Sequence, residues 1–349
     1  MEMKDLLILC SQKNASDLHL SPNQPPLLRI DGDLTPVKDA PPLSAEEIKK
    51  LVYTTMDQGL QYQLDTQLEV DYATEVEGVA RFRVNVFHQS LGLAGVFRVI
   101  PQIIPTLDQL HLPPVFKQLL SLPNGLILIT GPTGSGKSTT LAAMVDDINI
   151  NQSEHIITIE DPIEFTHKSK KSLINQRQVI RDTHDFAAAL RSALREDPDV
   201  MLVGEMRDLE TIRLALTAAE TGHLVMGTLH TSSAPRTISR IVDVFPAGEK
   251  NVIRNMLSES LQAVICQTLL KKIGGGRIAA FEIMLGTPAI RNLIREDKIA
   301  QMYTSIQTGH AVGMCTLDQY LQELLNKQLI TVETAHEAAL DKNHFKLKQ

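Results

Sequence analysis

Tryptophan is absent from this 349-residue chain, and aromatic residues make up only 4% of it. Proteins that bind single-stranded nucleic acid stack bases on aromatic side chains, so the shortage argues against such a platform. Thirty-four basic residues stand against 41 acidic ones, which gives a net charge of −7. This balance also argues against a general nucleic-acid binder, and we expect no nucleic-acid partner.

Cysteine is scarce as well. Cys10, Cys266 and Cys315 lie far apart, so they offer neither a disulfide framework nor a metal site and suit a reducing cytosol. No apolar run approaches the ~18 residues of a membrane span. The charged residues 1–5 are also unlike a secretory signal. We therefore expect a cytoplasmic protein that meets a membrane only through partners.

The most informative feature that is present is a glycine-rich segment of the form G-x-x-x-x-G-K-S. It consists of Gly131, Pro132, Thr133, Gly134, Ser135, Gly136, Lys137 and Ser138. The apolar run 126–130 before it predicts a buried parallel strand, and residues 139–145 predict a helix. Glycines allow the tight turn that aims backbone N–H groups at a phosphate, and the helix N-terminus adds its positive dipole end.

This Walker A pattern predicts a nucleoside triphosphate site. Lys137 would reach the β- and γ-phosphates, and the Ser138 hydroxyl would ligate Mg²⁺. Thr139 completes the predicted nucleotide-binding set. We expect ATP as the nucleotide, although no base-contacting motif is legible.

Carboxylates follow two other predicted strands. Glu205 ends the apolar run 200–204, and at the carboxyl edge of a parallel sheet it would orient Mg²⁺ directly or through water. Its alternative is a solvated acid at a strand end. Strand 155–159 runs into Glu160, Asp161 and Glu164. We choose Glu164 as the base that polarises the attacking water, while Glu160 and Asp161 remain the alternative working pair.

Further candidates are a histidine and three arginines. His230 follows the predicted strand 224–229, where it is either a γ-phosphate sensor or a structural hydrogen-bonding group. Arg81, Arg83 and Arg98 lie on two predicted strands near the N-terminus. A period of two places Arg81 and Arg83 on one face and apolar residues on the other.

The chain divides into segments of different texture. Residues 1–100 predict a small α+β domain, and the proline-punctuated residues 101–114 predict a linker. Residues 115–349 alternate strands with longer helical patterns, which predicts an ATPase domain with a parallel sheet, mainly helical from about residue 287.

The order of these motifs resembles that of the type II/type IV secretion ATPases, and within them the type IV pilus retraction ATPases, along nearly the whole chain. Residues 289–296 (AIRNLIRE) resemble the C-terminal signature of retraction ATPases. The four-cysteine zinc module usual in extension ATPases is absent. Periodicity alone gives residues 289–296 an ordinary amphipathic helix.

The resemblance implies a PAS-like N-terminal domain, a RecA-like ATPase domain and a homohexamer. It gives Arg81, Arg83 and Arg98 the role of neutralising charge on the γ-phosphoryl group. ATP-driven closure of the domains about residues 101–114 would power pilus retraction and twitching motility at the cytoplasmic face of the inner membrane. The implied partners are an inner-membrane platform protein and a paralogous retraction ATPase. A pilus-extension or type II secretion ATPase, an accessory ring subunit and a nucleic-acid translocase remain alternatives.

Overall fold

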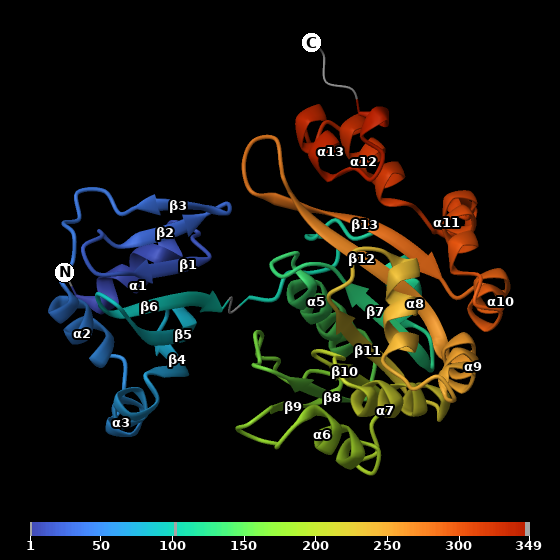
Figure 1. Ribbon diagram of the computed structural model, residues 1–349, viewed down its shortest axis with the longest axis horizontal. Coiled ribbons are helices and arrows are strands. Elements are labelled where there is room, and N and C mark those ends of the chain that lie inside the picture. The colour runs from blue at the N-terminus through green and yellow to red at the C-terminus, as the bar shows by residue number, and fades with distance from the viewer. Residues whose placement is uncertain (1, 101–102, 346–349) are drawn as a thin grey trace. The chain divides into compact units, whose positions relative to one another are not determined.

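The computed structural model describes residues 2–100 and 103–345 (Figure 1). Contacts divide the chain into two units, Met1–Ile103 and Ile104–Gln349, each with a hydrophobic core of its own. The first two residues of the predicted linker lie outside the described residues, and Leu107 is already buried in the core of the second unit. Among the described residues, no helix combines the length and the apolarity needed to cross a membrane.

The N-terminal unit is a six-stranded antiparallel sheet in the order β3-β2-β1-β6-β5-β4, with three helices packed on one face. The elements are α1 (Met3–Gln12), β1 (Asp17–Leu20), β2 (Leu27–Ile30), β3 (Asp33–Pro36), α2 (Ala45–Tyr53), α3 (Gln58–Gln67), β4 (Glu69–Val76), β5 (Ala80–Gln89) and β6 (Gly92–Ile100). In β5, Phe82, Val84 and Val86 are fully buried, whereas Arg81 and Arg83 are half-buried on the opposite face. This is the alternation that the sequence predicted.

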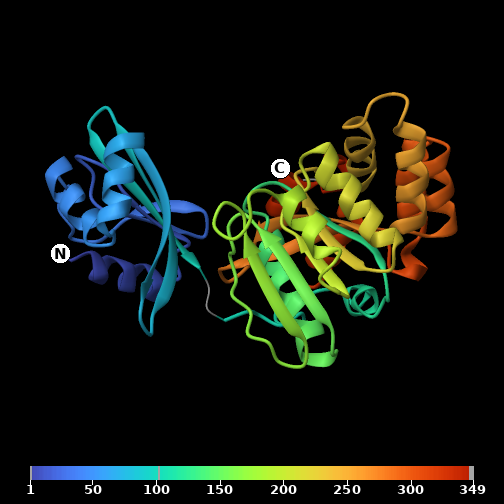
Figure 2. The same ribbon diagram turned by 90° about the horizontal axis from the view of Figure 1, so that it is seen from below.

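The second unit is built on a seven-stranded sheet in the order β13-β12-β7-β11-β10-β8-β9 (Figures 1 and 2). Its strands are β7 (Gly125–Thr130), β8 (His155–Glu160), β9 (Leu173–Gln178), β10 (Val200–Val203), β11 (Leu224–Leu229), β12 (Leu261–Lys271) and β13 (Arg277–Leu285). Its α-helices are α4 (Val115–Leu120), α5 (Lys137–Asn151), α6 (Phe186–Ala193), α7 (Leu209–Glu220), α8 (Ala234–Asp243), α9 (Lys250–Ser260), α10 (Pro288–Arg295), α11 (Ile299–Thr308), α12 (Leu317–Asn326) and α13 (Val332–Ala338).

Two apolar cores cover the two faces of this sheet. Side chains of α4 and α5 fill one core, and side chains of α6 to α11 fill the other. Strands enclosed in this way must be apolar on both sides, and every residue of β7, β10 and β11 is buried. The predicted fold class, a small α+β unit before an α/β unit with C-terminal helices, is confirmed.

One strand departs from the predicted parallel sheet. β13 runs antiparallel to β12, because the two are joined by a short hairpin instead of a helical crossover. Gly274, Gly275 and Gly276 occupy this turn with positive φ angles, which side-chain-bearing residues rarely adopt.

Phe281 of β13 connects the sheet to helices on its outer edge. Its ring is fully buried and packs edge-on against Phe116 and Tyr320, each with 5.4 Å between ring centroids.

Replacing Phe281 with alanine removes both contacts and leaves a cavity, so we expect a loss of about 3–5 kcal/mol in the free energy of unfolding. Denaturant titration of the whole chain measures it. Ile180→Ala, at an 84% exposed position of the same unit, should change stability little, and equal effects would contradict this role.

Candidate nucleotide site

The glycine-rich segment forms a loop between β7 and α5, where the sequence predicted a strand–loop–helix. β7 ends at Thr130 and α5 begins at Lys137. Gly131, Gly134 and Gly136 have φ angles of 142°, 80° and 86°, a region that favours glycine. The loop therefore delivers its backbone directly to the N-terminus of α5, which is the arrangement that binds phosphate.

Lys137 is half-buried at the first position of α5. Its Nζ donates to the carbonyl oxygens of Gly131, at 2.9 Å, and Pro132, at 3.1 Å. Burial lowers the pKa of Lys137, while the charges of Glu205 and Glu164 act in the opposite direction. The three predicted groups therefore belong to one electrostatic site, although they come from three separate strand ends.

Glu205 lies just beyond the carboxyl end of β10, which ends at Val203. One of its carboxylate oxygens is 3.1 Å from Nε2 of His230, which directly follows β11, and it also pairs with Arg207. The predicted acid and the predicted histidine are thus in contact. His230 is 43% exposed in its side chain, so one side of it is open to a ligand.

The acidic segment after β8 separates into two kinds of carboxylate. Glu160 is half-buried, accepts hydrogen bonds from Thr158 Oγ1 (2.7 Å) and Gln176 Nε2 (3.1 Å), and has its pKa raised by desolvation. Asp161 is exposed. Glu164 is half-buried and lies within electrostatic reach of Lys137. The arrangement favours Glu164, over Glu160, as the group that faces the phosphate loop.

Gln176 of β9 organises this acidic segment, and sequence inspection missed it. Its amide nitrogen donates to Glu160 and to the carbonyl of Phe165 (2.9 Å), and its amide oxygen accepts from the backbone N–H of His167 (2.8 Å). Three bonds from one side chain fold the segment back on itself. No motif in the sequence marks Gln176, because its partners lie 9 to 16 residues away in the chain.

The three arginines lie in the N-terminal unit, apart from the phosphate loop in the chain. Arg83, Arg98 and Asp17 are in register across β5, β6 and β1. Arg98 Nε donates to Asp17 Oδ1 at 2.8 Å, and Arg29 lies 3.9 Å from the same carboxylate. The buried Asp17, which the sequence gave no reason to select, thus holds Arg98 on the open face of the sheet. A role for the three arginines in catalysis stays a prediction.

The predicted Mg²⁺ ligands, Ser138 and Glu205, fit a magnesium site in their chemistry. A hydroxyl and a carboxylate are hard oxygen donors, and Mg²⁺ bound with a nucleotide takes most of its remaining ligands from phosphates and water. The described residues contain no cluster of three or more histidine, cysteine or acidic side chains that could hold a metal by themselves.

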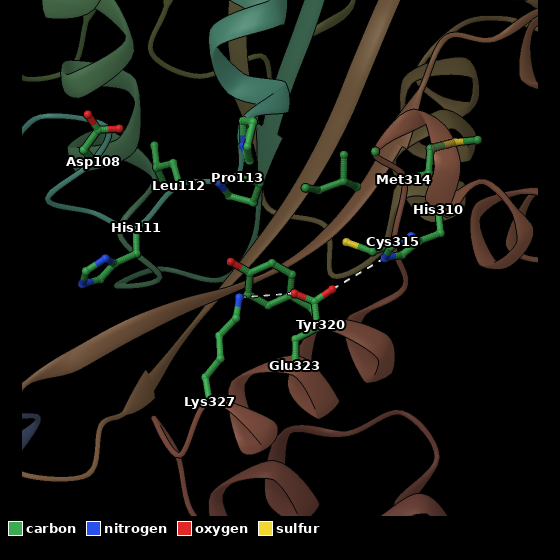
Figure 3. A pocket seen from close by; sticks show the side chains of 13 residues that line it. Asp108, His111, Leu112, Pro113, His310, Met314, Cys315, Tyr320, Glu323 and Lys327 are labelled. Atoms are coloured by element: carbon green, nitrogen blue, oxygen red, sulfur yellow. Dashed lines mark ion pairs between the residues drawn. The ribbon is translucent and has the colours of Figure 1, made fainter.

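A cavity of about 420 Å³ lies elsewhere in the second unit (Figure 3). Leu112, Cys315 and Tyr320 line it, and Glu323 pairs at its rim with Lys327 (3.5 Å) and His310 (3.7 Å). No residue of the phosphate loop lines this cavity. It is therefore separate from the nucleotide site.

A phosphate loop joined by carboxylates from neighbouring strand ends defines the second unit as a P-loop nucleotide-binding domain. A family model described as Type II/IV secretion system protein matches residues 9–276. Over 345 residues the chain is 60% identical to the type IV pilus retractation ATPase PilT of Pseudomonas aeruginosa, covering 99% of this chain and 100% of that protein. It is 38% identical to the type IV pilus ATPase PilU of the same organism, covering 99% and 91%.

A crystal structure of the pilus retraction motor PilT with bound ADP has the same fold. Its TM-score is 0.87 at 49% sequence identity, and the match covers 99% of this chain and 98% of that one. The chain therefore belongs to the type II/IV secretion system protein family, and it is an ATPase of that family. The resemblance inferred from the motifs is confirmed.

Burial lowers the pKa of His167, in the acidic segment, to about 4, with Lys170 acting in the same direction and Asp146 against it. Because an unfolded histidine titrates near 6.5, the unfolded state binds the proton first as pH falls. The free energy of unfolding therefore has its full value above about pH 6.5. As the pH falls toward 4, it decreases by about 3 kcal/mol at most. In His167→Gln, denaturant titration should show a flatter stability profile between these pH values. His184→Gln, at an exposed site, is the control and should keep the wild-type slope.

Proposed function

We propose that this ATPase is a homohexameric motor that binds ATP and ADP and powers type IV pilus retraction and twitching motility. The observation that carries the proposal is the convergence of Lys137, Glu164 and Glu205 in a chain 60% identical over its length to a retraction ATPase. The proposed place of action is the cytoplasmic face of the inner membrane. There the ring would engage a platform protein, with a paralogous retraction ATPase as a further partner.

Each proposed site residue has a chemical task. Lys137 would exchange its two loop carbonyls for the β- and γ-phosphates, while the loop N–H groups bind the phosphate oxygens. Glu164 would accept a proton from the attacking water. His230, held beside Glu205, would contact the γ-phosphate. Ser138 and Glu205 would hold Mg²⁺, which neutralises phosphate charge when bound.

The N-terminal arginines would complete the site by stabilising charge on the γ-phosphoryl group. Asp17 supports this role for Arg98, because it fixes the guanidinium on the open face of its sheet. Closure of the two domains about residues 101–114 on ATP binding, and release after hydrolysis, would convert the chemical cycle into movement of the platform protein.

Lys137→Ala, Glu164→Ala and Glu205→Ala test the assignment of the site. We expect each to lower steady-state ATP hydrolysis at least a hundredfold, because phosphate binding, proton transfer and metal orientation are each lost. Glu333→Ala, on the exposed surface of α13, is the matched control and should keep full activity. Light scattering of every variant should give six times the 38.6 kDa chain mass.

The outcomes separate the alternatives. Full hydrolysis by Glu164→Ala would show that another carboxylate is the base. A well-formed wild-type ring with negligible hydrolysis would favour the accessory-subunit alternative. Stimulation by duplex DNA that fades with added salt would favour a nucleic-acid translocase. Loss of retraction, with extension preserved, in cells carrying Lys137→Ala would distinguish a retraction motor from an extension ATPase.

The magnesium assignment has its own test. Ser138→Ala removes one proposed oxygen ligand, so the Mg²⁺ concentration for half-maximal hydrolysis should rise about tenfold, the size expected for one lost polar contact to a charged group. Ser138→Thr keeps the hydroxyl and should titrate like the wild type. An unchanged Mg²⁺ titration in Ser138→Ala would remove this residue from the metal site.

A further inference from the structure

The strand that runs beside the phosphate loop carries a buried polar side chain. β12 pairs in parallel with β7 up to Cys266, opposite Thr130. At that point β7 ends and its chain turns into the loop at Gly131, whereas β12 continues. The next residue of β12, Gln267, therefore lies beside the loop, and it is only 2% exposed.

Gln267 bonds to the C-terminal half of the phosphate loop and to the helix that follows it. Its Nε2 donates to the backbone carbonyl of Ser135 at 2.7 Å, and its Oε1 accepts from the Thr140 hydroxyl at 2.8 Å. A carbonyl can only accept, so the orientation of the amide group is fixed by Ser135. One side chain thus bridges the loop and the first turn of α5.

The loop glycines fit closely against this residue. A Cβ atom at Gly131 would lie 2.2 Å from the backbone oxygen of Gln267, and one at Gly136 would lie 2.9 Å from its Nε2. Both positions also have positive φ angles. Gln267 therefore forms part of the surface against which the loop folds, and the glycines are needed there for contact as well as for backbone conformation.

The bond to Ser135 has a consequence for phosphate binding. The Ser135–Gly136 peptide is trans, so its C=O and N–H point in opposite directions. Because Gln267 holds the C=O toward β12, the Gly136 N–H is turned away from β12, toward the concave side where a loop of this type holds phosphate. We infer that Gln267 is a positioning residue of the nucleotide site, which orients the Gly136 N–H toward the nucleotide's phosphate.

A glutamine is the side chain that this position requires. Glutamate has the same shape, but its carboxylate would face the Ser135 carbonyl with no hydrogen to donate. It would also add a negative charge beneath a site for a polyanion. The inference rests on the proposed nucleotide site, and it adds Gln267 as the residue of β12 that holds the phosphate loop in shape.

The test is equilibrium binding of a fluorescent N-methylanthraniloyl ADP to the full-length chain. In Gln267→Glu we expect the dissociation constant to rise at least tenfold, because one hydrogen bond is lost and a carbonyl is left buried against a carboxylate. Thr140→Val should weaken binding severalfold, and Thr140→Ser, which keeps the hydroxyl, should restore wild-type affinity. Light scattering should give each of these variants the same oligomer mass as the wild type.

Gln262→Glu is the matched control. Gln262 lies on the same strand, is half-buried, and donates through Nε2 to the carbonyl of Asn124 at 3.1 Å, at the opposite end of β7. The same substitution there should leave the dissociation constant within twofold of the wild type. Equal weakening by Gln262→Glu and Gln267→Glu would overturn the inference, since both would then act through general loss of stability.

Lys137→Ala in the same assay separates the two hypotheses. If Lys137→Ala loses binding but Gln267→Glu and Thr140→Val bind like the wild type, the inference about Gln267 is wrong and the proposed site stands. If Lys137→Ala binds ADP like the wild type, the proposed site itself is wrong. If Gln267→Glu fails to fold, the contrast between Thr140→Val and Thr140→Ser decides.

Discussion

The nucleotide site depends on the electrostatic interaction between the half-buried ammonium group of Lys137 and the carboxylates of Glu164 and Glu205. Burial disfavours its charge, and Glu164 and Glu205 offset that cost from two other strand ends. The loop carbonyls of Gly131 and Pro132 satisfy its hydrogens at the same time. A phosphate that enters must replace these carbonyls, so the bound anion and the two carboxylates would share one cation.

The parallel sheet brings these groups together. In such a sheet the carboxyl ends of the strands lie at one edge, so residues that follow different strands become neighbours. The phosphate loop follows β7, Glu164 comes after β8, Glu205 after β10 and His230 after β11. Four chain segments that are distant in sequence therefore form one site without a long loop. The apolar strands that position them are buried on both faces, which leaves the site on a rigid support.

The sequence could predict what depends on local patterns. The strand–loop–helix around Lys137, the carboxylates after two strands and the alternation in β5 each lie within one continuous segment of the chain, so the physical reason for each is visible locally. Gln267 could not be assigned in this way, because its partners Ser135 and Thr140 lie 132 and 127 residues away. Asp17 and Arg98, 81 residues apart, present the same difficulty. A polar residue within an apolar strand does signal a buried partner, yet it does not say which one.

The helix that carries the resemblance to retraction ATPases illustrates a further limit of pattern analysis. The i, i+3, i+4 spacing of Ile290, Leu293 and Ile294 predicts one apolar face. In α10, Ile290 and Ile294 are fully buried and Leu293 is partly buried against the same core. Arg291, however, is occupied internally: its guanidinium donates to the carbonyls of Gly286 (2.7 Å) and Ser258 (2.6 Å), and also to that of Glu259. It thereby satisfies carbonyls at the C-terminus of α9, immediately before the chain enters β12.

This placement divides the signature into two parts with different physical roles. Arg291 stabilises the junction between α9 and β12, the strand that bears Gln267 under the phosphate loop, whereas Asn292 and Glu296 are exposed to solvent. A substitution at Arg291 would leave the carbonyls at the end of α9 without their donor and disturb the start of β12. A substitution at the exposed positions would alter only the surface that α10 presents. Loss of motility after changing the whole segment therefore cannot by itself distinguish a lost partner contact from a displaced strand, whereas single substitutions can.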